Sequence, residues 1–350
     1  MQTLIVLLLT FCVAIITTPL TIILAKRWDI VDMPNNRKVH KTPIPTIGGV
    51  PIYISFIVGL LIADPFEPEI KPIVIGGGIL LLLGLIDDVV DLKAWIKLLV
   101  QIFVAGIVVY YGIMIDFISP FGYLIEFGFW SIPVTIIWVV GITNAFNLID
   151  GLDGLSSGVA VIALTTIGFI SILQGNIFIM LICVILIGSL LGFLVYNFHP
   201  AKIFMGDNGA LLIGYIISVV SLLGFKNITL ISLFFPLVIL GVPFIDMFFA
   251  VIRRYKKGVS IVGADKEHLH HKLIKLGFSH RQTVILIYTI AIMFSAASIV
   301  LYHSTNWGVL IIFVLLLITI QLIVEMTGLI DDDYKPILNT IRNMIRKKIK

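Results

Sequence analysis

Apolar stretches of about 20 residues recur along this chain from end to end, and they restrict its fold more than any other feature. A helix of that length spans the ~30 Å hydrocarbon layer of a bilayer. The 350 residues are 59% hydrophobic and only 13% charged, which lies outside the range of soluble globular domains. We therefore predict an all-α polytopic integral membrane protein of about eleven transmembrane helices. The predicted spans are residues 2–25, 48–63, 72–90, 95–112, 131–148, 155–173, 177–196, 208–224, 229–252, 284–302 and 307–326.

The distribution of basic residues predicts the orientation of these spans. The first span has no basic residue before it and is followed by Lys26 and Arg27, which indicates a retained helix with its N-terminus outside, and not a cleaved signal peptide. In the eleven-span arrangement, all but Lys71 and Lys226 of the 24 lysines and arginines lie on the inner side, as the positive-inside rule requires. The net charge of +4 then reflects topology, and no nucleic-acid partner is implied.

The chain is predicted to form one transmembrane domain, residues 1–330, followed by a basic amphipathic tail, residues 331–350. The tail would lie as an interfacial helix on the inner leaflet, so the C-terminus is cytoplasmic. An outer segment, residues 113–130, alternates apolar residues around a Pro-Phe-Gly turn and predicts a small hairpin. The predicted cytoplasmic loops are residues 26–47, 87–95, 147–155, 197–207 and 253–283.

Carboxylates gather at the predicted inner ends of the spans. Burying or half-burying unpartnered carboxylates costs several kcal/mol each, so these residues require an explanation. Both cysteines lie within apolar spans, which indicates neither a disulfide nor a thiolate metal site. The acids at inner span ends are Asp87, Asp88, Asp91, Asp150, Asp153, Asp207 and Asp246.

The segment GLIDDVVDLK, residues 84–93, carries three of these acids. If the third span continues as a helix past Ile86, Asp91 shares a face with Asp87 and with Asp88. Like charges this close call for a cation, and hard oxygen ligands with room for phosphate oxygens suit Mg²⁺. The alternative is a solvated span end, and GLIDD indeed recurs at residues 328–332, where a solvated tail is the better interpretation.

The segment TNAFNLIDGLDGLSSG, residues 143–158, follows an apolar run. Asn144, Asn147 and Asp150 line one side of a helix end, and Gly151 lets the backbone turn so that Asp153 is presented separately. Amides at such spacing suit recognition, and carboxylates suit metal or bases. A polar helix end with glycine caps is the structural alternative.

Two further segments add groups that suit phosphate. In YNFHPAKIFMGDNG, residues 196–209, the turn Gly206-Asp207-Asn208-Gly209 opens a new span, where main-chain N–H groups would suit an anion and Asp207 its metal; a purely structural turn is the alternative. The loop KEHLHHKL, residues 266–273, holds three histidines without a cysteine or a fourth clustered ligand. Phosphate binding therefore fits this loop better than zinc.

Five segments in order resemble the polyprenyl-phosphate N-acetylhexosamine-1-phosphate transferases of glycosyltransferase family 4: HKTPIPTIGG, GLIDDVVD, NAFNLIDGLDGL, NFHPAKIFMGDNG and HLHHK. The resemblance covers nearly the whole chain, and it is closest to the bacterial branch that uses UDP-N-acetylglucosamine and undecaprenyl phosphate to start teichoic acid or other surface glycans. It implies a single catalytic domain in the bacterial cell membrane, a cytoplasmic-facing site, Mg²⁺ or Mn²⁺, a broken ninth span and release of UMP. We also include a second copy of the chain, in a homodimer, among the expected partners.

The resemblance also implies roles for individual residues. Asp207 and Asp88 would hold the metal, Asp87 and Asp88 would act on the lipid phosphate, and Lys41 would contact phosphate. Asn147, Asp150 and Asp153 would line the nucleotide pocket, and Asn197 and Phe204 would lie near the uracil and ribose. Asn144, from its place on the same helix face, is a further candidate for substrate binding. The histidine motif near the diphosphate would be His268, His270 and His271, followed by Lys272 where the family usually has arginine, which puts a bidentate phosphate contact in doubt.

Attack of a lipid phosphate on a nucleotide diphosphate brings anions together, so the site needs metal and basic groups. Residue types do not decide whether an aspartate deprotonates the lipid phosphate or first forms a covalent intermediate; we favour direct attack. A phospho-MurNAc-pentapeptide transferase is the alternative within the family. A secondary transporter is the alternative of another class, but its acids should lie near mid-membrane. A scaffold without catalysis would leave the Gly-Asp and Asn-Asp arrangements unexplained.

Overall fold

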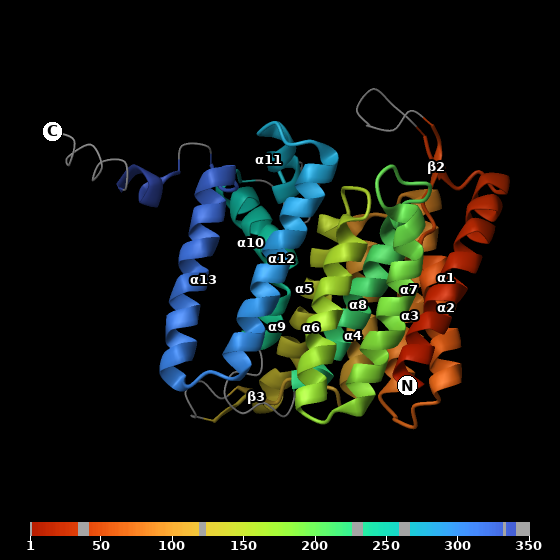
Figure 1. Ribbon diagram of the computed structural model, residues 1–350, viewed down its shortest axis with the longest axis horizontal. Coiled ribbons are helices and arrows are strands. Elements are labelled where there is room, and N and C mark those ends of the chain that lie inside the picture. Colours follow the sequence, from red (N-terminus) through yellow and green to blue (C-terminus); the bar gives the residue numbers. More distant parts are fainter. Residues whose placement is uncertain are drawn as a thin grey trace.

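The computed structural model describes residues 2–33, 42–118, 124–225, 234–258, 267–331 and 334–340. These form a helical bundle with two small two-stranded sheets (Figure 1). The helices are α1 (Gln2–Arg27), α2 (Gly49–Ala63), α3 (Ile70–Val90), α4 (Ala94–Tyr110), α5 (Ser131–Ile149), α6 (Leu155–Leu173), α7 (Ile177–Asn197), α8 (Gly206–Phe225), α9 (Phe234–Ile239), α10 (Gly241–Lys256), α11 (Leu269–Lys275), α12 (His280–Tyr302) and α13 (Asn306–Thr327), with a short 3-10 turn at Gly128–Trp130.

The all-α polytopic architecture predicted from the apolar stretches is confirmed. Within the described residues, eight helical segments are long and apolar enough to cross a membrane, and α2 and α4 are shorter apolar helices. The ninth predicted span is divided into α9 and α10. Each predicted stretch thus corresponds to a helix or a pair of helices, while eleven crossings remains a prediction.

The division of the ninth span has a local cause. The backbone at Leu240 leaves helical geometry, with φ −90° and ψ 23°. Pro243 lies in the first turn of α10 and has no N–H to donate to a carbonyl of the preceding turn. One continuous helix therefore becomes a short and a longer segment, in agreement with the broken span that the family resemblance implied.

Helix α8 forms the centre of the bundle. Most of its residues are buried, and it packs against α3, α5, α2, α6 and α7. A helix that is apolar around its whole circumference is stable only when it is surrounded by other helices. Because Asp207 stands in the first turn of α8, the central helix delivers this carboxylate to one end of the core.

The segments predicted to be cytoplasmic and those predicted to be outside lie at opposite ends of the bundle. The end of α1, strand β2 (Ile44–Pro45) and α11 lie at the upper end in Figure 1, whereas the N-terminus and strand β3 (Phe117–Ile118) lie at the opposite end. The upper end carries the segments predicted to be cytoplasmic. The relative sidedness of these segments therefore agrees with the predicted topology, and the orientation in the cell stays a prediction.

Each sheet is a single antiparallel pair. β3 pairs with β4 (Ile125–Glu126), as expected for the outer hairpin, whose tip lies outside the described residues. β1 (Val31–Asp32) pairs with β2, a pairing that the sequence did not suggest. The main-chain N–H of Phe204 donates to the Pro45 carbonyl at 2.7 Å. β2 thereby joins the first inner loop to the connection between α7 and α8.

Candidate active site

Two aspartates and a lysine meet where α3 ends and α8 begins. The Lys97 ammonium, at the start of α4, lies 2.9 Å from Asp87 Oδ2 and 2.9 Å from Asp207 Oδ2. The main-chain N–H of Leu92 donates to the other Asp87 oxygen at 2.9 Å. The predicted acids on α3 and α8 are therefore brought together, and Lys97 supplies positive charge between them.

Asp88 faces the same junction through a different partner. Its Oδ2 accepts a hydrogen bond from the Asn208 side chain at 2.5 Å. The same Asn208 amide donates to the Thr46 carbonyl at 2.7 Å and accepts from the Gly49 N–H at 2.6 Å. Asn208, which is fully buried, therefore fixes Asp88, the first inner loop and the start of α8 in one arrangement.

The close approach of α3 to α8 depends on a glycine. A Cβ added at Gly84 would lie 2.2 Å from Asn208 Cα and 2.7 Å from the Asp207 carbonyl carbon, distances that real side chains do not adopt. Only a residue without a side chain allows the backbones to approach this closely. Gly84 thus sets the separation between the two segments that carry the acids.

The prediction that Asp91 shares a face with Asp87 and Asp88 is wrong. Helix α3 ends at Val90, and Asp91 adopts a left-handed conformation, with φ 54° and ψ 75°, while its N–H bonds to the Asp87 carbonyl. The C-terminal residue of a helix commonly turns this way to satisfy a last carbonyl, and aspartate tolerates it better than most residues. Asp91 is consequently exposed and does not join the cluster.

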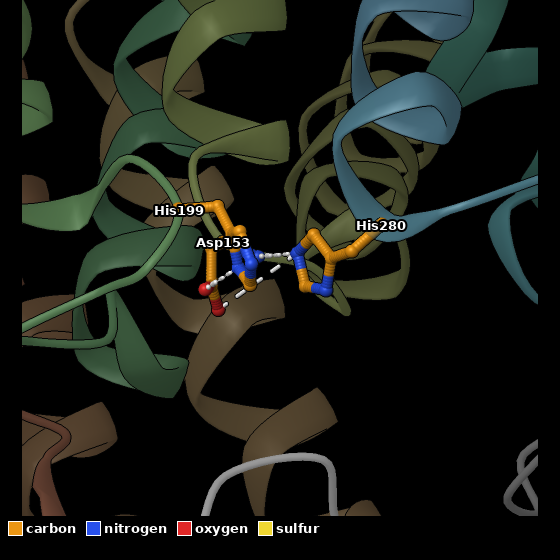
Figure 2. Close-up of side chains that lie close together, drawn as sticks. All are labelled: Asp153, His199 and His280. Atoms are coloured by element: carbon orange, nitrogen blue, oxygen red, sulfur yellow. Dashed lines mark hydrogen bonds and ion pairs between the residues drawn. The ribbon is translucent and has the colours of Figure 1, made fainter.

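Asp153 lies in the turn between α5 and α6 and contacts two histidines from distant segments (Figure 2). Its Oδ2 lies 2.7 Å from His199 Nδ1 and accepts from the Ala201 N–H at 3.1 Å. Its own N–H donates to His280 Nε2 at 3.0 Å. The separate presentation of Asp153 that the glycines predicted is therefore observed, and the turn is joined to the α7–α8 connection and to the start of α12.

Asp150 stands at the end of α5 between the two groups of acids. Burial raises the pKa of Asp150 well above its ordinary value, and the negative charges of Asp207, Asp88 and Asp153 raise it further. A carboxyl group in such surroundings holds a proton more tightly than a solvated one. Raised pKa values of this kind are typical of functional sites.

The histidine loop packs against the same turn. A Cβ at Gly151 would lie 2.2 Å from His270 Nε2, so the His270 ring occupies the space that a side chain there would need. His270 is 2% exposed, and its Nε2 has no hydrogen-bond partner within the described residues. Burial, and then the nearby charges of His271, His268 and His280, lower the pKa of His270 well below its ordinary value. This imidazole is therefore neutral near pH 7.

His268 is held by a buried acid on the broken span. Asp246, on α10, accepts from the Leu269 N–H at 2.8 Å through one oxygen and lies 3.0 Å from His268 Nδ1 through the other. His271 lies beside His270, with ring centroids 4.1 Å apart. Asp246 therefore fixes the start of α11, and the three predicted histidines lie close together.

Other predicted residues have their polar groups engaged elsewhere. Asn144 exchanges hydrogen bonds with Gln101 on α4 at 2.6 and 3.3 Å. The buried Asn197 amide accepts from Ser157 and donates to the Ile203 carbonyl, both at 2.9 Å. These contacts are structural, and the substrate roles of Asn144 and Asn197 stay predictions. Phe204 is held by β2 through its main chain and is partly exposed.

Three more predicted residues remain to be placed. Asn147 lies partly exposed on the last turn of α5, and Lys272 is largely buried in α11. Lys41 lies outside the described residues. Their predicted contacts with substrate stay predictions.

Sequence reasoning missed the partners that complete these clusters. They are Lys97, Asn208, His199, His280 and Asp246. Asp246 had been noted as an acid at a span end, and His199 lies within the motif NFHPAK, so both carried a local signal. His280 opens a span and had none, because only the packing of α12 beside α6 brings it to Asp153.

Comparison with known proteins places the chain in a family. Residues 71–225 match the model of "Glycosyl transferase family 4". The "Probable undecaprenyl-phosphate N-acetylglucosaminyl 1-phosphate transferase" of Bacillus subtilis is 44% identical over 95% of this chain and 94% of its own length. The "Decaprenyl-phosphate N-acetylglucosaminephosphotransferase" of Mycolicibacterium smegmatis is 34% identical over 80% of this chain and 78% of its own. The "Undecaprenyl-phosphate alpha-N-acetylglucosaminyl 1-phosphate transferase" of Escherichia coli is 30% identical over 83% of this chain and 82% of its own. The protein therefore belongs to glycosyl transferase family 4.

Proposed function

We propose that this protein transfers N-acetylglucosamine-1-phosphate from UDP-N-acetylglucosamine to undecaprenyl phosphate and releases UMP. An oxygen of the lipid phosphate forms a bond to the β-phosphorus of the donor, and the bond from that phosphorus to the bridging oxygen breaks, so that UMP leaves. The product, undecaprenyl-diphosphate-N-acetylglucosamine, would begin a teichoic acid or another surface glycan. The names of the relatives support this reaction.

The observation that carries the proposal is the junction at one end of the core, where Asp87 and Asp207 meet at Lys97 and Asp88 is held by Asn208. A transporter that carries its substrate across the bilayer would need its acids near mid-membrane. Here the acids lie at helix ends, next to the turn of Asp150 and Asp153. That position suits a reaction between a lipid headgroup and a water-soluble nucleotide.

The donor set fits Mg²⁺ or Mn²⁺. Asp207 and Asp88 offer carboxylate oxygens on adjoining segments, and in the described residues the positive charge between Asp87 and Asp207 comes from Lys97 alone. Hard divalent cations are bound through one or two carboxylates together with substrate phosphates. Asp207 and Asp88 would hold the ion, which would offset the negative charge of the diphosphate.

The chain's own residues would divide the remaining work. Asp87 would orient the lipid phosphate and hold its proton, and Lys97 would attract both anionic substrates to the junction. Asp150 and Asn147 would face the nucleotide, and the neutral His270, with its free Nε2, would offer a hydrogen bond to the diphosphate beside Gly151. We favour direct attack by the lipid phosphate, without a covalent enzyme intermediate.

The reaction also sets the location that we propose. Undecaprenyl phosphate is held in a membrane, and the basic segments gather at the end of the bundle that carries α11 and β2 (Figure 1). By the positive-inside rule this end would face the cytoplasm of a bacterial cell, where nucleotide sugars are available to the site.

The test is an assay of the purified protein in detergent with Mg²⁺, undecaprenyl phosphate and labelled donor, in which UMP is measured. We expect turnover with UDP-N-acetylglucosamine and little with UDP-N-acetylmuramyl-pentapeptide, because a compact site excludes the larger donor sterically. Comparable rates with the two donors, or faster turnover of the pentapeptide donor, would overturn the choice of donor and leave the reaction class standing. Absence of UMP with either donor would overturn the reaction class.

A further inference from the structure

Three potential metal ligands from three separate segments converge beside the proposed active site. Asp153 comes from the α5–α6 turn, His199 from the α7–α8 connection and His280 from the first residue of α12. One ligand atom from each lies within 4.8 Å of the others, and Figure 2 shows the carboxylate and both rings lying next to one another. Residues this far apart in sequence meet here only because of the tertiary packing.

The separations are close to those of a tetrahedral metal site. With metal–ligand bonds of ~2.0–2.1 Å, two ligands of one ion stand about 3.3 Å apart. Asp153 Oδ2 and His199 Nδ1 are 2.7 Å apart, and Asp153 Oδ1 and His280 Nε2 are 3.9 Å apart. One distance is shorter than this separation and the other is longer. Side-chain movements of less than about 1 Å would therefore give each pair the spacing of two ligands that share one ion.

The hydrogen bonds fix the tautomer of one histidine. Because the Asp153 N–H donates to His280 Nε2, that nitrogen is an acceptor, and the proton of a neutral ring is on Nδ1. A metal bound at Nε2 would replace this hydrogen bond. His199 Nδ1 would bind metal after its proton moves to Nε2. The two rings stack with centroids 4.3 Å apart and an interplanar angle of 23°. Because a metal ion binds in the plane of an imidazole ring, at least one ring would have to rotate for both to share an ion.

The ligand chemistry selects the ion. Two imidazoles and one carboxylate suit zinc, cobalt or nickel, whereas Mg²⁺ prefers oxygen ligands throughout. The side chains of His199, Asp153 and His280 are 31%, 14% and 15% exposed, so water can reach the site and supply a fourth ligand. The cluster therefore differs in kind from the all-carboxylate junction of Asp87, Asp88 and Asp207.

We propose that Asp153, His199 and His280 form a binding site for a divalent metal ion of the zinc class, separate from the proposed magnesium site. A bound ion would tie the α5–α6 turn to the α7–α8 connection and to α12. Helix α12 is already linked to the α7–α8 connection by Arg281, which donates to the His199 carbonyl at 3.2 Å, and to the α5–α6 turn by the hydrogen bond from Tyr288 to the Gly154 carbonyl. The inference does not depend on the proposed transferase activity.

The experiment measures zinc retention by the full-length protein in detergent. After treatment with chelator, the protein is dialysed against dilute Zn²⁺ in excess Mg²⁺, and the bound zinc is quantified by mass spectrometry. Replacement of one ligand should weaken retention by at least ~10-fold, so His199→Gln and His280→Gln should both lose zinc. His303→Gln is the matched control, because His303 follows α12 at the other end of its 23 residues, about 35 Å away at 1.5 Å per residue.

Three further measurements separate the possible outcomes. Co²⁺ should give the visible absorption of a tetrahedral site in the wild type and not in a variant that lacks both His199 and His280. Asp207→Asn should retain zinc, since its carboxylate belongs to the other site. Zn²⁺ should raise the temperature of unfolding of the wild type and leave that of the double variant unchanged, with circular dichroism used to verify its fold.

Equal zinc retention by the wild type and the double variant would overturn the proposal and leave the cluster as a hydrogen-bonded link. Loss of zinc on His270→Gln, with retention in His280→Gln, would also overturn it by assigning the ion to the histidine loop. A protein that binds zinc as expected but releases no UMP would contradict the proposed function and leave this inference intact.

Discussion

Gly84→Ala tests whether the spacing of α3 and α8 controls the proposed reaction. The new methyl group would lie 2.2 Å from Asn208 Cα, whereas ordinary van der Waals contact begins near 3.4 Å. The neighbouring atoms are backbone, so no side-chain rotation can relieve the clash. The two segments must separate by roughly 1 Å. Overpacking a dense interior in this way costs ~1–3 kcal/mol of stability.

The same displacement would separate the acids of the junction. Asp88 stands on α3 and Asp207 on α8, and a misplacement of about 1 Å in an active site can reduce turnover by about 100-fold. We expect Gly84→Ala to release UMP about 100-fold more slowly at saturating substrates and to unfold at a lower temperature in detergent. Both quantities are measured on the same preparation.

Gly106→Ala provides the control for this comparison. Apart from the neighbouring backbone of α4 itself, a Cβ at Gly106 would have no atom within 4 Å, and both substitutions gain the same helix propensity, up to ~1 kcal/mol. Gly106→Ala should therefore keep wild-type turnover and equal or greater stability. If Gly84→Ala retains turnover within about twofold of the wild type and unfolds at the same temperature, the spacing argument is refuted.

Three further predictions concern charge and topology. Asp207→Asn should lower turnover by orders of magnitude without unfolding the protein, and excess chelator should do the same until Mg²⁺ or Mn²⁺ is restored; full activity in chelator would contradict a metal requirement. The pKa of Asp150 is raised in the folded state, so the native protein binds more protons than the unfolded chain above pH ~4. The stability that this residue contributes therefore falls as the pH rises from there toward the folded-state pKa. Thermal unfolding of Asp150→Asn should lack this decline, and a pH profile equal to that of the wild type would contradict the raised pKa. Single cysteines at Glu67 and Asp116 should react with an impermeant reagent in intact cells, whereas one at Lys202 should not; the reverse pattern would exclude the proposed orientation.

The sequence alone was sufficient where the physical cause is local or is summed over one helix. Twenty apolar residues must form a helix in a bilayer because unpaired backbone groups are too costly there, so the bundle and the approximate bounds of its helices could be predicted. Gly154, with φ 76°, and the glycines around it likewise predicted a turn after α5. The capping of α3 by Asp91 is also local, but its left-handed conformation competes closely with another helical turn, and sequence reasoning chose the wrong one.

Tertiary structure decided which side chains meet. The order of the motifs indicated that Asp87, Asp88 and Asp207 belong to one site, yet only the packing of α3, α4 and α8 brings Lys97 between Asp87 and Asp207. Asp153 meets His280 across 127 positions of sequence. Such contacts arise from the burial of apolar helix faces, which fixes helix positions without regard to the polar residues at their ends. The apolar pattern of the sequence therefore determined the helices, while the partners of each acid followed from the assembled bundle.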